Sequence, residues 1–371
     1  MNSFWEKESL LHFDVIIIGG GITGISAAIT VKEKSPSTSV AIFEAGSFHS
    51  GATTKNAGFA CFGSITELLD DEQSMGTSKM LDLVEKRWNG LKKLIKRVGE
   101  SNLDYHNYGG FELLFHPIDQ AEIDRINQLL FPIFNQPVFS IKNQLIQQFG
   151  FDPRRVKQII ANPFEGQLDS GKMMNQLLRI AGSLDIRIFT NTMVNEIKSN
   201  IVETEAASYT CNQTVICTNA FTKQLLPTYE LDLIPGRGQV LITKPIQNLK
   251  FKGVFHYDNG YFYFRNIGSR VLFGGGRNLA MKEEETTIID LNFSIQNKLL
   301  EDLHSIILPS TPFEIDYQWA GIMAFGKDKY PIVKRINNQQ TLAVKLGGMG
   351  IALGSLIGEE IAELTLEKIS T

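Results

Sequence analysis

The segment that most constrains the fold lies near the N-terminus, where an apolar strand runs into a glycine-rich turn and then a helix. Residues 14–18 are dominated by β-branched apolar side chains on both faces, which is typical of a central strand in a parallel sheet. Residues 19–24 carry the pattern G-x-G-x-x-G, residues 22–33 are rich in alanine and isoleucine as in a helix, and residues 40–43 form the next apolar strand. This βαβ unit predicts that an α/β fold begins at once.

The glycine turn also predicts a ligand. Gly19 permits a tight turn, Gly21 lets the backbone approach a pyrophosphate, and Gly24 lets the helix pack closely on the strand. The helix N-terminus then presents free N–H groups and the positive end of its dipole to the phosphates. Glu44 ends the second strand about 20 residues after Gly24, where an acidic side chain hydrogen-bonds a ribose hydroxyl. The pattern predicts an adenine dinucleotide, either NAD or FAD.

Two other segments favour FAD. The loop at residues 51–58 consists of small and hydroxyl-bearing residues, and Gly58 suits a backbone that lies flat against a pyrophosphate and the edge of an isoalloxazine ring. The turn at residues 347–350 holds three glycines around Met349 and opens the last predicted helix. The N–H groups of that helix could stabilise negative charge on a reduced flavin.

Charge and composition argue against several other classes of protein. The net charge is −4, and acidic and basic residues are mixed along the chain, so no basic stripe indicates a nucleic-acid partner. The longest apolar stretch, residues 15–31, is interrupted by glycines and is shorter than the ~20 residues that cross a bilayer, and the N-terminus lacks the pattern of a signal peptide. Cys61, Cys211 and Cys217 have no metal-ligand spacing and are expected to be buried thiols in a reducing compartment. These features predict a cytoplasmic protein with no membrane span and no metal site.

The rest of the chain alternates between helical and strand patterns. Helices are expected at 64–71, 79–98, 119–130, 142–149, 172–181, 292–307 and 351–368, and strands at 186–190, 193–198, 208–211, 214–217, 239–243, 260–265, 270–274, 332–333 and 342–345. Residues 104–115 are expected to form a hairpin that turns at Gly109-Gly110. The predicted fold is α/β, with an FAD-binding Rossmann-type domain interleaved with an antiparallel-sheet α+β substrate domain. The FAD-binding domain would comprise residues 1–85, 155–220 and 321–371, and the substrate domain residues 86–154 and 221–320.

Dispersed motifs make the chain similar to a known family. They are the glycine turn with Glu44, the loop at 52–58, Gly166-Gln167-Leu168-Asp169, residues 214–220, Trp319-Ala320-Gly321 and the turn at Gly347. Together they resemble the D-amino-acid-oxidase-type FAD oxidoreductases, which include glycine oxidase, sarcosine oxidase and gamma-glutamylputrescine oxidase. Residues 262–265 and 270–276 are most similar to the last of these.

The resemblance implies a set of cofactor contacts. The glycines and Thr23 of the first turn would hold the pyrophosphate, Glu44 would bind the adenosine ribose, and the backbone of Val194 would pair with adenine. Residues 54–58 and 218–220 would lie along the flavin, and Gly321 with residues 348–352 would close its pyrimidine side. The full set of expected FAD residues is Gly19, Gly21, Ile22, Thr23, Gly24, Glu44, Ala45, Ala52, Thr53, Thr54, Lys55, Asn56, Ala57, Gly58, Val194, Thr218, Asn219, Ala220, Gly321, Gly347, Gly348, Met349, Gly350, Ile351 and Ala352. FAD is expected to be noncovalent, because the family's attachment positions carry no cysteine or histidine here.

The chain departs from the family pattern at three places. After Trp319-Ala320-Gly321 it lacks the arginine that clamps the substrate carboxylate in members that act on free amino acids. Met349 stands where the C-terminal glycine turn often has arginine or histidine, and residues 271–273 lack the lysine that sarcosine oxidases use for oxygen activation. The sequence therefore leaves open the substrate and the electron acceptor, whether oxygen or another molecule.

The expected reaction is oxidation of a C–N bond in a small amine or amino-acid derivative by hydride transfer to flavin N5. Such a reaction needs substrate positioning more than acid–base catalysis. Alternation along residues 261–264 would direct Tyr261 and Tyr263 to one face, where aromatic walls exclude water and hold a cationic amine. Either tyrosine could instead belong to an ordinary sheet core.

Three cationic side chains are further candidates. Arg265 and Arg277 could grip a substrate carboxylate with two parallel hydrogen bonds, although a surface position fits each nearly as well. Lys55 lies inside the predicted flavin loop and could orient N5 or assist oxygen, or it could be a solvated lysine. His256 precedes the aromatic strand and is interpreted as a structural histidine.

Two other functions fit parts of the sequence. Residues 235–240 resemble the R-G-Q-V motif of FAD-binding tRNA-modification modules of the same fold, although the chain shows no basic stripe. The missing carboxylate arginine is also compatible with a non-catalytic flavoprotein subunit. The oxidoreductase is the favoured hypothesis, and no nucleic-acid partner is expected.

Overall fold

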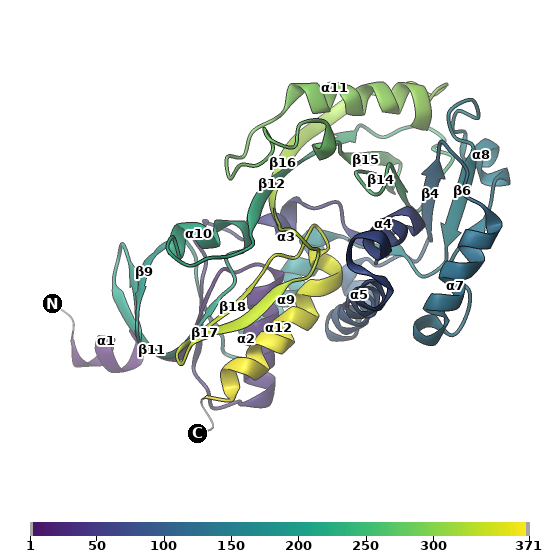
Figure 1. Ribbon diagram of the computed structural model, residues 1–371. Coiled ribbons are helices and arrows are strands. Elements are labelled where there is room, and N and C mark those ends of the chain that lie inside the picture. The colour runs from purple at the N-terminus through teal and green to yellow at the C-terminus, as the bar shows by residue number, and fades with distance from the viewer. Residues whose placement is uncertain (1–2, 369–371) are drawn as a thin grey trace.

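The computed structural model describes residues 3–368, which form two large β-sheets with helices packed around them (Figure 1). Strands of the first sheet come from the beginning, the middle and the end of the chain, and strands of the second sheet come from the segments between. The first sheet is mainly parallel and the second mainly antiparallel, so the predicted α/β class with a second antiparallel sheet is confirmed.

The first sheet has the order β17-β18-β11-β1-β2-β8, and a hairpin extends it from β11. Its strands are β1 (His12–Ile18), β2 (Val40–Phe43), β8 (Arg187–Phe189), β9 (Val194–Lys198), β10 (Ile201–Thr204), β11 (Ser208–Ile216), β17 (Ile332–Asn337) and β18 (Gln340–Val344). The central strand β1 pairs in parallel with both β2 and β11. Val15 and Ile17 pack into the core under the helices, whereas Ile16 and Ile18 belong to a second core on the other face. Burial on both faces explains why this strand is apolar throughout.

One face of the first sheet is covered by helices from distant parts of the chain. They are α2 (Ile22–Lys34), α5 (Thr77–Val98), α9 (Ser170–Ser183) and α12 (Gly350–Leu366). Glycines allow α12 to pack closely on α2: a Cβ on Gly354 would lie 2.6 Å from Ile22 Cγ2, and one on Gly358 would lie 2.5 Å from Ser26 Cβ. The last helix of the chain is thereby held beside the first turn of α2, which brings the two glycine turns to the same end of the sheet.

The second sheet has the order β16-β12-β15-β14-β13-β4-β6-β5. Its strands are β4 (Gly110–Leu114), β5 (Ser140–Ile141), β6 (Gln158–Asn162), β12 (Ile234–Thr243), β13 (Val254–Tyr257), β14 (Phe262–Ile267), β15 (Arg270–Gly275) and β16 (Ile315–Phe325). Adjacent strands of this sheet are antiparallel, except that β4 and β13 pair in parallel. A short ribbon of β3 (Phe59–Ala60) and β7 (Gly166–Gln167) lies apart from both large sheets.

Helices cover the second sheet on both sides. Figure 1 shows α11 (Phe293–Asp302) lying over one face, where it continues into a π turn (Leu303–Ile307) and packs on aromatic side chains such as Phe264 and Phe273. On the opposite side, α4 (Ile65–Met75), α5 and α7 (Gln120–Phe134) enclose a separate core that includes Leu114 and Ile160. The remaining helices are short: α1 (Phe4–Ser9), α3 (Ala52–Lys55), α6 (Glu100–Leu103), α8 (Gln144–Phe149), η1 (Asn219–Phe221), α10 (Thr222–Leu225) and η2 (Arg277–Leu279).

The hairpin predicted at residues 104–115 is wrong. The backbone does turn at Gly109, whose φ is +88°, but the chain does not fold back on itself there. Instead β4 begins at Gly110 and pairs with β13 and β6, while His106 forms a bridge with Gln167. The partners of this segment lie far away in the sequence, so a local turn signal was misleading.

Two further expectations change. Residues 208–211 and 214–217 were predicted as separate strands, but β11 is continuous across Asn212-Gln213. Its first half pairs with β10, which the sequence reasoning missed, and its second half pairs with β18. The predicted loop at residues 51–58 contains the helix α3, and the strand β3 follows this loop directly at Phe59.

The assignment of residue ranges to an FAD-binding domain and a substrate domain stays a prediction. Strand β6 lies within residues 155–220 but pairs in the second sheet, and the C-terminal half of α5 packs with α12 although it lies beyond residue 85. Among residues 3–368, no helix combines the length and the apolar character needed to cross a bilayer.

Candidate functional site

The first turn has the geometry that its glycines predict. Gly19 has φ +105°, in the left-handed region, and a Cβ there would lie 2.6 Å from the carbonyl oxygen of Cys217. A Cβ on Gly24 would overlap the carbonyl oxygen of Gly19, so only glycine allows α2 to start this close to β1. The first turn of α2 carries N–H groups that the helix itself does not bond, and one of them, on Ile22, donates to Thr53 Oγ1 at 3.0 Å.

Backbone N–H groups fix the carboxylate of Glu44 at the end of β2. Gly20 N–H donates to Glu44 Oε2 at 3.0 Å, and Gly46 N–H donates to Oε1 at 2.9 Å. The imidazole of His49 lies beside this group, with Nδ1 2.7 Å from the carbonyl oxygen of Gly20 and 3.8 Å from Glu44 Oε2. Thr192 N–H donates to the carbonyl oxygen of Glu44 at 2.9 Å, which brings the start of β9 to the same corner.

The loop at residues 51–58 is held by its own side chains. Asn56 Nδ2 donates to the carbonyl oxygen of Thr53 at 2.6 Å, and Asn56 Oδ1 accepts from Gly58 N–H at 2.7 Å and from Ser170 Oγ at 2.6 Å. Gly58 has φ +71°, and a Cβ there would overlap the carbonyl oxygen of Leu168. The loop is therefore a fixed surface, anchored on the first turn of α9.

Strand β16 connects this loop to the C-terminal glycine turn. Trp319 Nε1 donates to the carbonyl oxygen of Lys55 at 3.0 Å, and a Cβ on Gly321 would lie 3.0 Å from Lys55 Cβ. Further along β16, Met323 Sδ lies 3.6 Å from the position of a Cβ on Gly348. The turn before α12 uses left-handed backbone at Gly347 and Gly348, with φ +57° and +82°.

Residues 218–220 follow β11 of the first sheet and lie beside Lys345, which follows β18. Asn219 has φ +47°, and its Oδ1 accepts from Lys345 N–H at 3.2 Å. Lys345 is buried and also left-handed, and its Nζ binds Asp232 at 3.1 Å and Asp328 at 2.9 Å. These bonds attach the segment after β11 to the segment that leads into the glycine turn.

The chain matches the family model described as DAO, FAD dependent oxidoreductase, over residues 14–364. The chain belongs to this family. It is 22% identical to a probable oxidoreductase OrdL of Rhizobium meliloti, with 96% of this chain and 83% of the relative covered, and 21% identical to gamma-glutamylputrescine oxidoreductase of Escherichia coli, with 95% and 83% covered. The solved L-proline dehydrogenase of P. horikoshii superposes with a TM-score of 0.77 at 18% identity, covering 96% of this chain and 94% of that structure.

Membership of the DAO family makes this protein an FAD-dependent oxidoreductase, as the sequence predicted. The geometry is compatible with that cofactor. A Cβ on Gly21 would meet only Thr53 Oγ1, so glycine leaves the backbone open to a pyrophosphate there, and Glu44 stands beside the turn. The individual FAD contacts remain predictions.

Of the candidate substrate residues, Tyr263 and Arg265 lie against the 51–58 loop and its continuation. The ring of Tyr263 meets that of Phe59 edge-to-face with centroids 5.6 Å apart, and burial raises the pKa of Tyr263 to about 12. Arg265 is buried, and its Nη1 lies 3.5 Å from the carbonyl oxygen of Gly58. Burial lowers the pKa of Arg265 to about 10, against the opposite influence of Asp169 and Asp104.

Tyr261 and Arg277 lie at the other end of the same region. Strand β14 begins at Phe262, so Tyr261 is a turn residue, and 38% of its surface is exposed. Arg277 is half-buried and its guanidinium lies 3.9 Å from the centre of the Phe325 ring. Burial lowers the pKa of Arg277.

The sequence did not predict several residues that contact the segments expected to bind the cofactor. His49, Lys345 and Ser170 contact predicted cofactor segments through bonds that join distant parts of the chain. Arg237, which carries the R-G-Q-V resemblance, binds Glu284 inside the fold through Nε at 2.9 Å and Nη2 at 2.8 Å. It therefore does not present a free cation at the surface.

A separate surface hollow of about 420 Å³ is lined by Trp88, Lys92, Ile95, Lys96, Glu100, Tyr105 and Asn107. It contains none of the candidate cofactor or substrate residues. Because the catalytic chemistry of an FAD enzyme must occur at the flavin, this hollow has no part in it.

Proposed function

We propose that this protein oxidises a C–N bond of a small amine or amino-acid derivative. Gamma-glutamylputrescine oxidoreductase and L-proline dehydrogenase are both named for nitrogen-bearing substrates, and both align with nearly the whole chain. When bound, FAD supplies the hydride acceptor of this oxidation, at its N5. The protein must then hold the amine with its Cα–H directed at that atom and keep water out.

The cofactor would be held from both ends of the chain. Gly19, Gly21 and the first turn of α2 would bind the pyrophosphate, and the fixed carboxylate of Glu44 would bind the adenosine ribose. Residues 54–58 would lie along the flavin, with residues 218–220, Gly321 and the N-terminus of α12 on its other sides. Close packing of α12 on α2 supports this assignment, because it places the two turns at one end of the sheet.

The observation that carries the proposal is the meeting of β14, β16 and the 51–58 loop around Tyr263. Its ring packs with Phe59 and belongs to a small apolar cluster with Ala57 and Trp319. With a pKa raised to about 12, the phenol stays neutral at physiological pH. A neutral tyrosine can offer both an aromatic face to an amine and a hydroxyl as hydrogen-bond donor.

Arg277 is our candidate for binding a substrate carboxylate. Stacking on Phe325 holds its guanidinium in one plane and leaves the N–H edge available for two parallel bonds. Arg265, in contrast, is 6% exposed and points at the carbonyl oxygen of Gly58, so we assign it to support of the loop. Lys55 touches β16 through its backbone and Cβ, which supports a position at the edge of the same site.

Anaerobic reduction tests the proposal directly. The FAD-loaded protein is mixed without oxygen with primary amines, N-alkyl amino acids, and D- and L-amino acids, and the flavin absorbance is followed. We expect one class to bleach the flavin, while the matched acids without nitrogen leave it oxidised. A flavin that dithionite reduces but no amine reduces would favour the non-catalytic subunit and overturn the proposal.

A further inference from the structure

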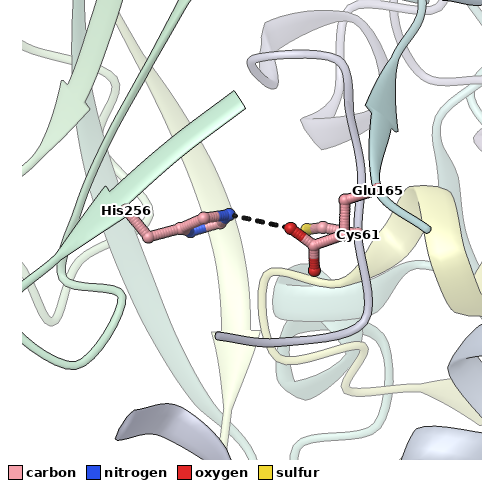
Figure 2. Close-up of side chains that lie close together, drawn as sticks. All are labelled: Cys61, Glu165 and His256. Atoms are coloured by element: carbon pink, nitrogen blue, oxygen red, sulfur yellow. Dashed lines mark ion pairs between the residues drawn. The ribbon is translucent and has the colours of Figure 1, made fainter. Parts of the chain in front are cut away.

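Three side chains with metal-ligating atoms meet in the interior beside the 51–58 loop. Cys61 follows β3, Glu165 lies in the turn between β6 and β7, and His256 lies on β13 (Figure 2). Their exposed fractions are 4%, 1% and 4%. One ligand atom from each lies within 4.8 Å of the other two, and His256 Nε2 is 3.6 Å from Glu165 Oε2.

The histidine is incompletely satisfied. Within residues 3–368, His256 Nε2 has no hydrogen-bond partner, although it is buried. Its charged neighbour Glu165 forms an ion pair with it at 3.6 Å, beyond hydrogen-bond distance, and burying such a nitrogen without a hydrogen bond costs on the order of 1–3 kcal/mol. The Glu165 side chain is held in place, because Oε1 accepts from Phe62 N–H at 3.3 Å and because the carboxylate packs against Gly110, which has no Cβ to displace it. Oε2 is therefore kept facing the imidazole.

The spacing suits an ion between the two groups better than a direct hydrogen bond. Direct N–H···O bonds have donor–acceptor distances of about 2.7–3.2 Å, which is shorter than the 3.6 Å between His256 Nε2 and Glu165 Oε2. Two ligands bound to zinc at about 2.0–2.2 Å, with a tetrahedral angle between them, lie about 3.4 Å apart. The observed separation is close to that value.

Charge and ligand type agree with this geometry. A thiolate, a carboxylate and a neutral imidazole together carry two negative charges, which a divalent ion neutralises in a buried site. Thiolate and imidazole favour zinc and similar transition metals over magnesium or calcium. A cavity of about 10 Å³ adjoins Glu165 and His256 and is also lined by polar Ser64 and Asn162 and by apolar side chains such as Phe111 and Ile160. A space of this size holds about one water molecule, which could serve as the fourth ligand.

We propose that Cys61, Glu165 and His256 bind one divalent transition-metal ion of the zinc type. The Cys61 thiol releases its proton to solvent as the metal–sulfur bond forms, and no electron is transferred. The ion joins the segment after the 51–58 loop to β13 and to the turn before β7. It therefore fixes the wall of the flavin site without contacting the substrate, and it does not depend on which amine is oxidised.

Metal binding to the FAD-loaded protein tests this site. Protein stripped with a chelator is titrated with Co²⁺, and the d–d absorption is read at wavelengths longer than the flavin bands. We expect one Co²⁺ per chain, displaced by Zn²⁺. Because changes in groups around metal ligands already cost about 10- to 100-fold in affinity, Cys61→Ser and Glu165→Gln should each weaken binding by at least about tenfold.

Cys211→Ser is the matched control, since Cys211 is also a buried free thiol but lies beside Thr214, outside the cluster. It should bind Co²⁺ as the unmodified protein does. If Cys61→Ser does not fold, zinc-edge X-ray absorption of the unmodified protein replaces it, and one sulfur at about 2.3 Å is expected. Less than about one-tenth of an ion per chain, equal binding by folded Cys61→Ser, or a zinc shell without sulfur would overturn the proposal.

Discussion

The indole N–H of Trp319 donates to the carbonyl oxygen of Lys55 at 3.0 Å and thereby ties the second sheet to the 51–58 loop. The predicted effect of Trp319→Phe follows from this bond, because phenylalanine keeps most of the ring and removes only the donor. Loss of one such bond is worth about 1 kcal/mol, or about fivefold in the Kd for FAD. Flavin fluorescence on titration measures it. Trp5→Phe, which changes a tryptophan that is 72% exposed, is the control and should leave the Kd unchanged.

A larger side chain in the first glycine turn should weaken cofactor binding without preventing the protein from folding. A Cβ on Gly21 would meet only Thr53 Oγ1, at 3.1 Å, so Gly21→Val should fold but fill the space of the pyrophosphate. We expect its affinity for FAD to fall more than about tenfold, with the far-UV circular dichroism retained. Gly182→Ala, in an open position on α9, should bind FAD normally. A Gly21→Val protein that is as yellow as the unmodified one would refute the assignment of this turn.

The sequence predicted the parts of the site whose cause is local. Strand, turn and helix at residues 12–34 follow one another directly, and each glycine there has a steric role that a pattern can express. The C-terminal turn was predicted for the same reason, since Gly347 and Gly348 adopt the left-handed backbone that glycine favours.

What the sequence did not predict depends on contacts between distant segments. Strand β4 pairs with β13, so the spacing of polar and apolar residues around Gly109 could not identify its partner. The cluster of Cys61, Glu165 and His256 has no ligand spacing for the same reason, since its members come from three separate segments. Tyr261 was assigned to a strand that begins one residue later, at Phe262, and is a turn residue.

Glu112 predicts a pH dependence of stability. It is buried, and burial raises its pKa from 4.5 to about 7, although Ser64 and Thr66 donate hydrogen bonds to it. Between these two values the unfolded chain binds fewer protons at this site than the folded chain does. The contribution of Glu112 to stability should therefore be fully present below about pH 4.5 and be lost as the pH rises through about 7, by up to about 3 kcal/mol.

The variant Glu112→Gln isolates this effect, because an amide cannot ionise. Urea unfolding at pH 5 and pH 8 should show a smaller loss of stability for Glu112→Gln than for the unmodified protein. Glu314→Gln, at an exposed carboxylate paired with Lys244, should keep the unmodified dependence in this range. Parallel pH profiles for Glu112→Gln and the unmodified protein would mean that Glu112 is ionised throughout.

Loss of the Arg277 guanidinium should weaken binding of substrates that carry a carboxylate and should not affect substrates that lack one. Arg277→Met keeps an unbranched apolar side chain over Phe325 but removes the charge and the donors. A charge-assisted bond to the substrate is worth about 1.5–3 kcal/mol, so KM for a carboxylate-bearing amine should rise about 10- to 100-fold. KM for a simple amine should stay the same, and kcat should change little for either. Arg154→Met, at an arginine side chain that is 87% exposed, controls for the loss of a positive charge. If Arg277→Met raises KM equally for both substrates, the guanidinium supports the site without binding a carboxylate.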